Sequence, residues 1–430
     1  MKDVSVFWFR RDFRYFDNKA LYFALNSNYN VLPIFIFDPK ILLNLDKQDH
    51  RVSLIYNCLE NLNQIFSKHG SGIKVFFDDP LKVFTSLSKK YNFRYLFFNR
   101  DYEPYAIERD SKITNYLNQN GIVTKTYKDQ VIFEQNDLLK KDGTPYKVYT
   151  PYSKFWLANL KAEFLQNFPS ENYLHNLVKL PNNKIISLSA IGFLKSNINF
   201  YNYDISNKLI NNYEETRNFP CQETSKIGVF LRFGLVSIRS IVKKAVQSRN
   251  NVFLKELIWR EFFMQILYHF PETVTKSFKS KYDNIKWRQN DYEFQMWCEG
   301  KTGYPLVDAG MRELSTTGFM HNRVRMLVAS FLCKHLLIDW RLGEAYFAKK
   351  LFDFELSSNI GNWQWVVGSG VDAAPYFRIF NPDTQQKKFD KNLFYIKKWV
   401  PEYLTDSYQE KIVDHTFARK RCLNEFKRIQ

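Results

Sequence analysis

Cysteine is scarce in this chain of 430 residues, and its apolar runs are short. The five cysteines are widely scattered and include no Cys-x-x-Cys pair, so the sequence predicts neither a disulfide framework nor a zinc site. Arg10 and Arg11 interrupt the first apolar run before it reaches the length of a signal peptide, and no later run approaches the length of a membrane span. We therefore expect a soluble, cytoplasmic protein without a membrane partner. We also expect it to be a monomer.

Signatures of several enzyme classes are missing as well. The seven histidines show no metal-ligand spacing, and the chain contains neither a Gly-x-Ser-x-Gly motif nor a P-loop. Metal-dependent and acyl-transfer chemistry therefore have little support. The segment GSGVDA at 368–373 matches Gly-x-Gly-x-x-Ala, but it lies in a helical pattern and follows no strand of a βαβ unit, so it does not predict a dinucleotide-binding turn.

Positive charge and aromatic side chains are abundant. Lys and Arg number 62 against 44 Asp and Glu, which gives a net charge of +18, and 17% of the residues are aromatic. The charge alone fits an acidic membrane surface or simple solubility, but neither alternative accounts for the aromatic content. Together the two features favour a nucleic acid partner, whose phosphates bind cations and whose bases stack on rings.

The apolar pattern changes character along the chain, which has room for two or three domains. In residues 1–125, short apolar runs alternate with amphipathic stretches, as in a doubly wound α/β domain with a parallel sheet. These runs begin at Val4, Val31, Ile73 and Arg94. Residues 126–195 lose periodicity and contain several prolines, which indicates an interdomain connector with some helix. Residues 196–430 show helical spacing, so we expect an all-α second domain.

Two helical stretches carry polar residues that are candidates for a site. Glu256, Trp259 and Arg260 share one face of the first, where an ordinary pair between Glu256 and Arg260 is an equally good interpretation. Asn322 and Met326 lie one turn apart on the second, and their amide and thioether can both bond and pack against a base or flavin edge.

A third candidate is the hydroxyl-rich segment Thr224–Lys226, which precedes an apolar helical run. Hydroxyls and backbone N–H groups at the start of a helix bind phosphate. The alternative is a cap that satisfies only its own helix. From these residues alone, the cap is the favoured interpretation.

Six ordered motifs closely resemble the photolyase and cryptochrome family, and the resemblance extends from Trp8 to about Glu402. They are WFRRDFR, ELIWREFF, TGYPLVDAGMREL, MHNRVRM, NIGNWQW and DAAPYFRIFNP. The sequence looks most like the class I-type cyclobutane pyrimidine dimer photolyases of bacteria. The resemblance implies an enzyme that splits these dimers in DNA by electron transfer from photoexcited reduced FAD to a flipped-out lesion. It also implies a bacterial, cytoplasmic protein that is associated with the nucleoid when bound to DNA.

The resemblance also implies which residues hold FAD in the helical domain. Asn359 matches the side chain that faces flavin N5, and Glu355 stands where the family usually has Asp. Phe319 replaces a frequent Trp. The matching FAD positions are Tyr213, Thr224, Ser225, Lys226, Ile227, Gly228, Arg260, Asn322, Arg325, Asp353, Glu355 and Asn359.

For the substrate, the resemblance implies a cavity with two tryptophan walls, Trp259 and Trp365. Glu256 matches the carboxylate that bonds the thymine edge, and Asn322 and Met326 match residues that contact both lesion and flavin. The cations that match DNA contacts are Arg217, Arg323 and Arg378. A relay of tryptophans that carries electrons to photoexcited flavin is matched by Trp363, Trp340 and Trp287.

Within the family, the residues favour dimer repair over the other activities. The (6-4) photolyases carry histidines at the positions of Asn322 and Met326, and DASH-type cryptochromes tend to have Gln and Tyr at the positions of Met326 and Trp365. The alternative is a flavin blue-light photoreceptor of the cryptochrome type, including the DASH type, with affinity for DNA. The folate-binding residues of the family correspond to Tyr105 and Ala106, so the antenna is left open among methenyltetrahydrofolate, a deazaflavin, another flavin or none.

Overall fold

The computed structural model describes residues 3–198 and 200–429. The chain divides into two compact units, each made of discontinuous segments. The first unit comprises Met1–Glu134, Asn159–Tyr201 and Gly228–Gln247, and the second comprises Gln135–Ala158, Asn202–Ile227 and Ser248–Gln430. The predicted connector, residues 126–195, thus contributes to both units, and the boundaries predicted at residues 125 and 195 stay predictions.

The first unit is built on a parallel five-stranded sheet, which confirms the expected α/β class. The strand order is β3-β2-β1-β4-β5, so the direction of winding reverses between β1 and β4. The strands are β1 (Asp3–Phe9), β2 (Asn30–Phe37), β3 (Lys74–Phe77), β4 (Asn92–Asn99) and β5 (Val123–Tyr127). Four of them coincide with the predicted apolar runs. The fifth, β5, was not predicted because it is a short edge strand of mixed polarity whose residues are at most half-buried.

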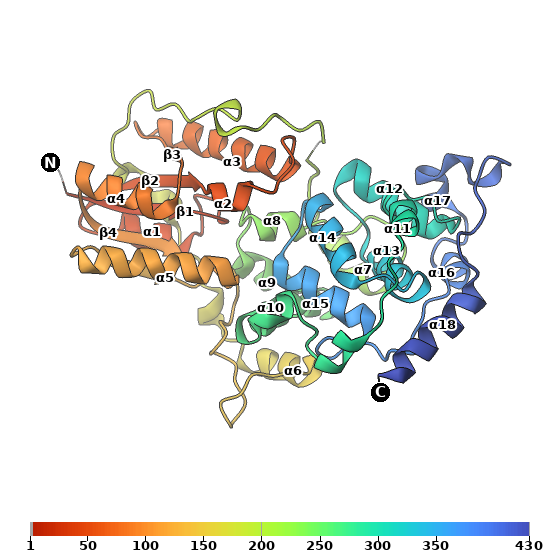
Figure 1. Ribbon diagram of the computed structural model, residues 1–430. Coiled ribbons are helices and arrows are strands. Elements are labelled where there is room, and N and C mark those ends of the chain that lie inside the picture. The colour runs from red at the N-terminus through yellow and green to blue at the C-terminus, as the bar shows by residue number, and fades with distance from the viewer. Residues whose placement is uncertain (1–2, 199, 430) are drawn as a thin grey trace. The chain divides into compact units, whose positions relative to one another are not determined.

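Helices α3 and α5 lie on opposite sides of this sheet (Figure 1). Asn18, Asp49 and Asp79 begin helices by accepting N–H groups of the first turn. The α-helices of this unit are α1 (Lys19–Leu25), α2 (Pro39–Leu42), α3 (His50–Ser67), α4 (Pro80–Lys90), α5 (Pro104–Gln119), α8 (Gly228–Arg232) and α9 (Ile238–Val246), with 3₁₀ turns at Ala162–Leu165, Ser170–Asn176 and Ser189–Ile191.

A buried ion network joins distant segments of the first unit. Asp129 binds Arg14 at 2.5 Å and Arg239 at 2.8 Å, and Arg239 also binds Asp17 at 2.8 Å. Burial raises the pKa of Asp129, but the two guanidinium groups outweigh this effect and hold the pKa below its usual value. The carboxylate therefore stays charged and ties α9 to segments more than a hundred residues earlier.

The second unit is helical, as the sequence predicted. Its α-helices are α6 (Tyr149–Asn159), α7 (Asn207–Thr216), α10 (Val252–His269), α11 (Asp291–Cys298), α12 (Pro305–Thr317), α13 (Asn322–Ser330), α14 (Trp340–Lys350), α15 (Leu356–Val367), α16 (Pro382–Phe389), α17 (Phe394–Trp399) and α18 (His415–Arg428). A π-helical turn, Phe331–His335, follows α13, and 3₁₀ turns cover Pro271–Val274, Ser280–Asn284 and Pro401–Leu404. None of the helices in the described ranges has the length and apolar character that crossing a membrane requires.

Two glycines let the central helices of this unit approach closely. A Cβ atom on Gly361 of α15 would lie 2.2 Å from the Phe263 ring on α10, and one on Gly343 of α14 would lie 2.2 Å from the Trp363 ring on α15. Such distances exclude any side chain unless the helices move apart. Helices α10, α14 and α15 therefore form one packed group, and the candidate site lies on it.

Candidate functional site

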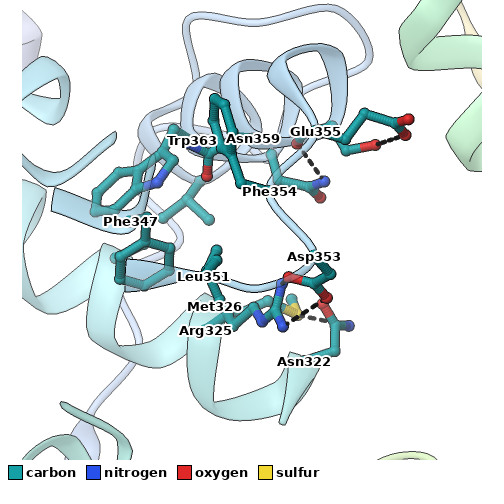
Figure 2. Close-up of a pocket in the computed structure, with 14 residues that line it drawn as sticks. Asn322, Arg325, Met326, Phe347, Leu351, Asp353, Phe354, Glu355, Asn359 and Trp363 are labelled. Carbon is teal, nitrogen blue, oxygen red and sulfur yellow. Dashed lines mark hydrogen bonds and ion pairs between the residues drawn. The ribbon is translucent and has the colours of Figure 1, made fainter. Parts of the chain in front are cut away.

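Two adjoining cavities in the second unit contain most of the predicted site residues. The first, here called the small cavity, is lined by α13, α15 and the segment Asp353–Glu355 (Figure 2). The second, the large cavity, has a volume of about 330 Å³ and lies between α10, α13 and α15. Residues that line both are Asn322, Met326, Ser358 and Asn362. The two cavities are therefore neighbours that share one wall.

An ion pair lies on the polar side of the small cavity. The Arg325 guanidinium donates to both oxygens of Asp353, at 3.1 and 2.9 Å (Figure 2). Its Nε donates to the Met320 carbonyl at 2.8 Å. Both side chains of the pair are mostly shielded from solvent. The bidentate geometry fixes the guanidinium plane, so a positive charge faces the cavity in a set orientation.

On the opposite side, Asn359 is held by Glu344. The Asn359 amide nitrogen donates to the Glu344 carboxylate at 2.8 Å and to the Glu344 carbonyl at 3.1 Å. Burial raises the pKa of Glu344, and the Asn359 hydrogen bond only partly offsets this effect. Glu344 was not among the predicted residues because its role depends on packing between α14 and α15, which spacing along one helix does not reveal.

Glu355 and Arg260 pair with each other across the end of the small cavity. Arg260 donates to Glu355 at 3.0 Å, and Ser358 donates to the same carboxylate at 3.4 Å. Glu256 instead accepts from Arg217 at the end of α7. The simple pair between Glu256 and Arg260 on α10 is therefore a wrong interpretation, because each side chain finds a partner from another segment.

Trp259 and Trp365 both line the large cavity, from α10 and α15 respectively. Tyr149 of α6 stacks on Trp259 with a ring separation of 3.7 Å and an interplanar angle of 8°. Its hydroxyl donates to the Lys255 carbonyl at 2.7 Å. Tyr149 was not predicted, although Tyr149, Tyr152 and Trp156 recur at helical spacing, a signal that marks a buried aromatic face.

Cations surround the large cavity. Arg217 and Arg323 line it, and Arg323 donates to Asn218 at 2.5 Å. The Arg378 guanidinium lies 5.9 Å from the Trp365 ring centre. His321, which caps α13, is kept neutral because burial and the neighbouring arginines lower its pKa to about 4. The positive charge at this cavity therefore comes from guanidinium groups.

The segment Thr224–Ile227 contacts the same Phe319 ring as Arg325, which lines the small cavity. The Lys226 ammonium lies 5.6 Å and the Arg325 guanidinium 5.8 Å from the Phe319 ring centre. Lys226 also binds Glu223 at 2.6 Å and has a positive φ of 50°. Within this segment the Ser225 hydroxyl accepts the Ile227 N–H at 3.5 Å. The Phe319 ring therefore makes cation–π contacts with two side chains, Lys226 and Arg325, from different segments.

The last two predicted flavin positions differ in where they lie. Gly228 begins α8 in the first unit. Tyr213 lies on α7, packed edge to face against Phe253 at 5.3 Å. Burial, with a smaller contribution from the Glu256 charge, raises the pKa of Tyr213 to about 12, so its hydroxyl remains a donor at neutral pH.

The three predicted relay tryptophans belong to one hydrophobic core. Trp363 lines the small cavity, and Trp340 begins α14 next to the close contact at Gly343. Trp287 is only partly buried. Trp297, which no prediction included, is fully buried and packs edge to face against Trp363 at 6.3 Å.

The antenna candidates lie in the first unit. The Tyr105 hydroxyl donates to Asp38 at 2.5 Å, and Ala106 is buried. The Lys40 ammonium lies 4.9 Å from the Tyr105 ring centre. Tyr105 is therefore held by its own neighbours, and the nature of any antenna stays open.

Comparison with known proteins gives matches to both parts of the chain. The family described as DNA photolyase matches residues 5–171, and the family described as FAD binding domain of DNA photolyase matches residues 253–405. A deoxyribodipyrimidine photo-lyase from Synechococcus sp. is 34% identical over 426 residues, which cover 92% of this chain and 87% of the relative.

Two solved photolyase structures are similar to this chain over nearly its full length. A bacterial class III photolyase from Agrobacterium tumefaciens superposes with a TM-score of 0.89 at 31% identity, covering 100% of this chain and 98% of that one. An archaeal photolyase from Sulfolobus tokodaii, described with two FAD molecules, gives a TM-score of 0.84 at 32% identity and covers 99% and 100%.

Proposed function

Because the chain belongs to the DNA photolyase family, we propose that it splits cyclobutane pyrimidine dimers in DNA, using light and FAD. The observation that carries this proposal is the pair of joined cavities, one with tryptophan walls and one with a fixed guanidinium. The assignment to the class I-type branch stays a prediction, since the class III photolyase is among the similar structures.

The residues of the small cavity fit a flavin. Phe347 and Trp363 offer flat rings and Val366 an aliphatic contact. Arg325 offers N–H groups to the polar edge of a ring, and Asn359, whose amide N–H groups both donate to Glu344, offers its carbonyl oxygen as an acceptor. Lys226, Ser225 and Thr224 supply an ammonium and hydroxyls for phosphates. When bound and reduced, FAD supplies the electron that opens the dimer after excitation. We propose that the positive charge of Arg325 holds the anionic form of the ring.

The large cavity suits a lesion that has left the base stack. Its volume of about 330 Å³ lies at the lower end of the usual range of ligand pockets, roughly 300 to 1,000 Å³. Trp259 and Trp365 present rings on which flat bases stack, worth roughly 1 to 3 kcal/mol per base. Glu256, oriented by Arg217, accepts hydrogen bonds from a pyrimidine edge. Asn322 and Met326, in the shared wall, contact both occupants.

DNA is held by charge around this cavity. The net charge of +18 attracts the backbone over long range, and Arg217, Arg323 and Arg378 are placed for phosphate contacts at the cavity rim. We propose that the chain binds as a monomer. Trp363, Trp340 and Trp287 are proposed as the path that restores the reduced cofactor from the protein surface, since they share a core that reaches from the small cavity to a partly exposed ring.

The decisive experiment is illumination of the reduced holoprotein with an oligonucleotide that contains one thymine dimer. We expect thymine absorbance to recover in the light and to stay constant in a dark sample of the same mixture. Repair should also stop when Trp365, the wall on α15, is replaced by alanine. A flavin-containing protein that binds the damaged duplex in the dark and returns no thymine absorbance in the light would refute dimer repair and favour the photoreceptor.

A further inference from the structure

Lys334 is a buried cation to which the proposed function gives no role. It lies in the π-helical turn Phe331–His335, and only 1% of its surface is exposed. Its ammonium donates to the carbonyl of Tyr376 at 3.2 Å and to the carbonyl of Arg378 at 2.9 Å. Burying an ammonium costs free energy unless its donors are satisfied, so these contacts account for its place in the core.

The two acceptors belong to one short segment, Ala374–Phe380, here called the rim segment. It has no helix or strand and lies between α15 and α16. Its first residue, Ala374, lies next to the wall of the large cavity, because its N–H donates to the Trp365 carbonyl at 3.2 Å. The segment carries Arg378 beside the Trp365 ring, and Phe377, which is 60% exposed. It therefore carries a cation beside Trp365, one wall of the large cavity.

Apolar packing fixes the far end of the rim segment, where Tyr376, Ile379 and Phe380 lie against the hydrophobic core. The Tyr376 ring stacks on Phe426 of α18 at 6.1 Å, and the Arg378 N–H closes a turn on the Pro375 carbonyl at 2.9 Å. The hydrogen bonds from Lys334 add an anchor from the core. These hydrogen bonds hold the carbonyls of Tyr376 and Arg378 toward the core. If the carbonyls turned outward, the Arg378 side chain would rotate away from the cavity. π-helical turns often occur at functional positions, and this one contains the anchoring lysine.

We propose that Lys334 is a positioning residue for DNA binding: its ammonium fixes the rim segment so that Arg378 stays against Trp365. The step from anchor to DNA affinity rests on the proposed function, because it takes the large cavity as the DNA-facing site. The anchor itself follows from the hydrogen bonds alone.

The charge on Lys334 depends on its surroundings. Burial lowers its pKa to about 8; the thiols of Cys422 on α18 and Cys333 on its own turn oppose this, and Arg378 adds to it. His335, the next residue of the turn, stays neutral because burial and neighbouring cations lower its pKa to about 3. As pH rises through 8, the ammonium loses its proton and the anchor weakens.

The test compares Lys334→Met, which removes the charge at similar length, with Cys333→Ala, which perturbs the same buried turn without touching the rim segment. We expect faster hydrogen exchange at Tyr376–Phe380 in Lys334→Met only. We also expect its dissociation constant for a dimer-containing duplex, measured in the dark by fluorescence anisotropy, to rise about tenfold at pH 7. The flavin content and the repair yield per bound dimer should stay unchanged.

A second variant, Lys334→Arg, keeps its positive charge at high pH, where the ammonium of the wild-type lysine has lost its proton. Its affinity should be close to that of the wild type at pH 7 and should exceed it at pH 9.5. Equal exchange at the rim segment in Lys334→Met and Cys333→Ala would overturn the anchor, and equal dark affinity would overturn its role in DNA binding. Both measurements are made without light. A wild type that fails to repair dimers would therefore count against the proposed function, while the anchoring role of Lys334 would still be judged by hydrogen exchange and dark affinity.

Discussion

At the scale of single residues, Glu256 and Arg217 form the contact that is most directly open to test. The carboxylate lines the large cavity and accepts from Arg217, and both side chains are only about one third exposed. We predict that Glu256→Ala lowers the repair yield about tenfold, because hydrogen bonds to charged groups contribute roughly 1.5 to 3 kcal/mol. The measurement is the number of dimers repaired per absorbed photon at saturating DNA. The absorption spectrum of each variant gives its flavin content.

Glu256→Gln is the matched control, since it keeps a hydrogen-bond acceptor of the same size. It should retain more of the yield than Glu256→Ala. Loss of flavin from Glu256→Ala would instead assign the residue to building the pocket, contrary to the role proposed for it.

The same residues mark the limit of what spacing along the chain can predict. The helical pattern correctly places Glu256, Trp259 and Arg260 on α10, but it suggests that Glu256 and Arg260 pair with each other. Their actual partners are Arg217 and Glu355, which lie 39 residues earlier and 95 residues later in the chain. Which charge lies nearest depends on how helices pack, and periodicity carries no information on that.

At the scale of secondary structure, α6 is the element whose role the sequence concealed. It lies in the stretch where periodicity weakens, yet it stacks Tyr149 on Trp259 and donates from Trp156 to Glu261 at 2.6 Å. The strands were predictable because a buried parallel strand leaves a continuous apolar run. The contribution of α6 was not, because its partners lie more than a hundred residues away on α10.

We predict that Tyr149→Ala weakens binding of a dimer-containing duplex about tenfold while flavin stays bound. The stack at 3.7 Å holds the Trp259 ring in place, and aromatic pairs contribute about 0.5 to 1.5 kcal/mol beyond the area they bury. Fluorescence anisotropy with damaged duplex measures the change. Phe155→Ala, an exposed aromatic of the same helix, is the control and should bind as the wild type does. If Tyr149→Ala bound the damaged duplex as tightly as the wild type does, Tyr149 would have no role in binding the lesion.

At the scale of the whole molecule, the chain crosses between its two units several times. Residues 159–201 and 228–247 return to the unit with the sheet, where Arg239 binds Asp17 and Asp129. The apolar pattern changes along the sequence from strand spacing to helix spacing, and it predicts three consecutive segments, 1–125, 126–195 and 196–430. It correctly predicts the two architectures, but the return of α9 depends on a buried ion network between distant residues.

Buried histidine gives the molecule a predictable response to acid. His335 is fully buried and bonded to His415 at 2.8 Å, and burial, His415 and nearby cations lower its pKa to about 3. In the unfolded chain its pKa is near 6.5. The unfolded state therefore takes up a proton first, so the stability that neutral His335 contributes is complete above pH 6.5 and is lost progressively as pH falls towards 3.

Between pH 7 and pH 5 this one group should cost about 2 kcal/mol of unfolding free energy, from about 1.4 kcal/mol per pH unit below 6.5. The variant His335→Gln cannot take up the proton. We predict that its stability deficit relative to the wild type, measured by urea unfolding, is smaller at pH 5 than at pH 7 by about that amount, because titrating groups that do not contact His335 cancel in the comparison. His175→Gln, at an exposed position, should show the same small difference from the wild type at both pH values. A deficit of His335→Gln that is equal at the two pH values would mean that His335 takes up its proton in the folded protein as readily as in the unfolded chain.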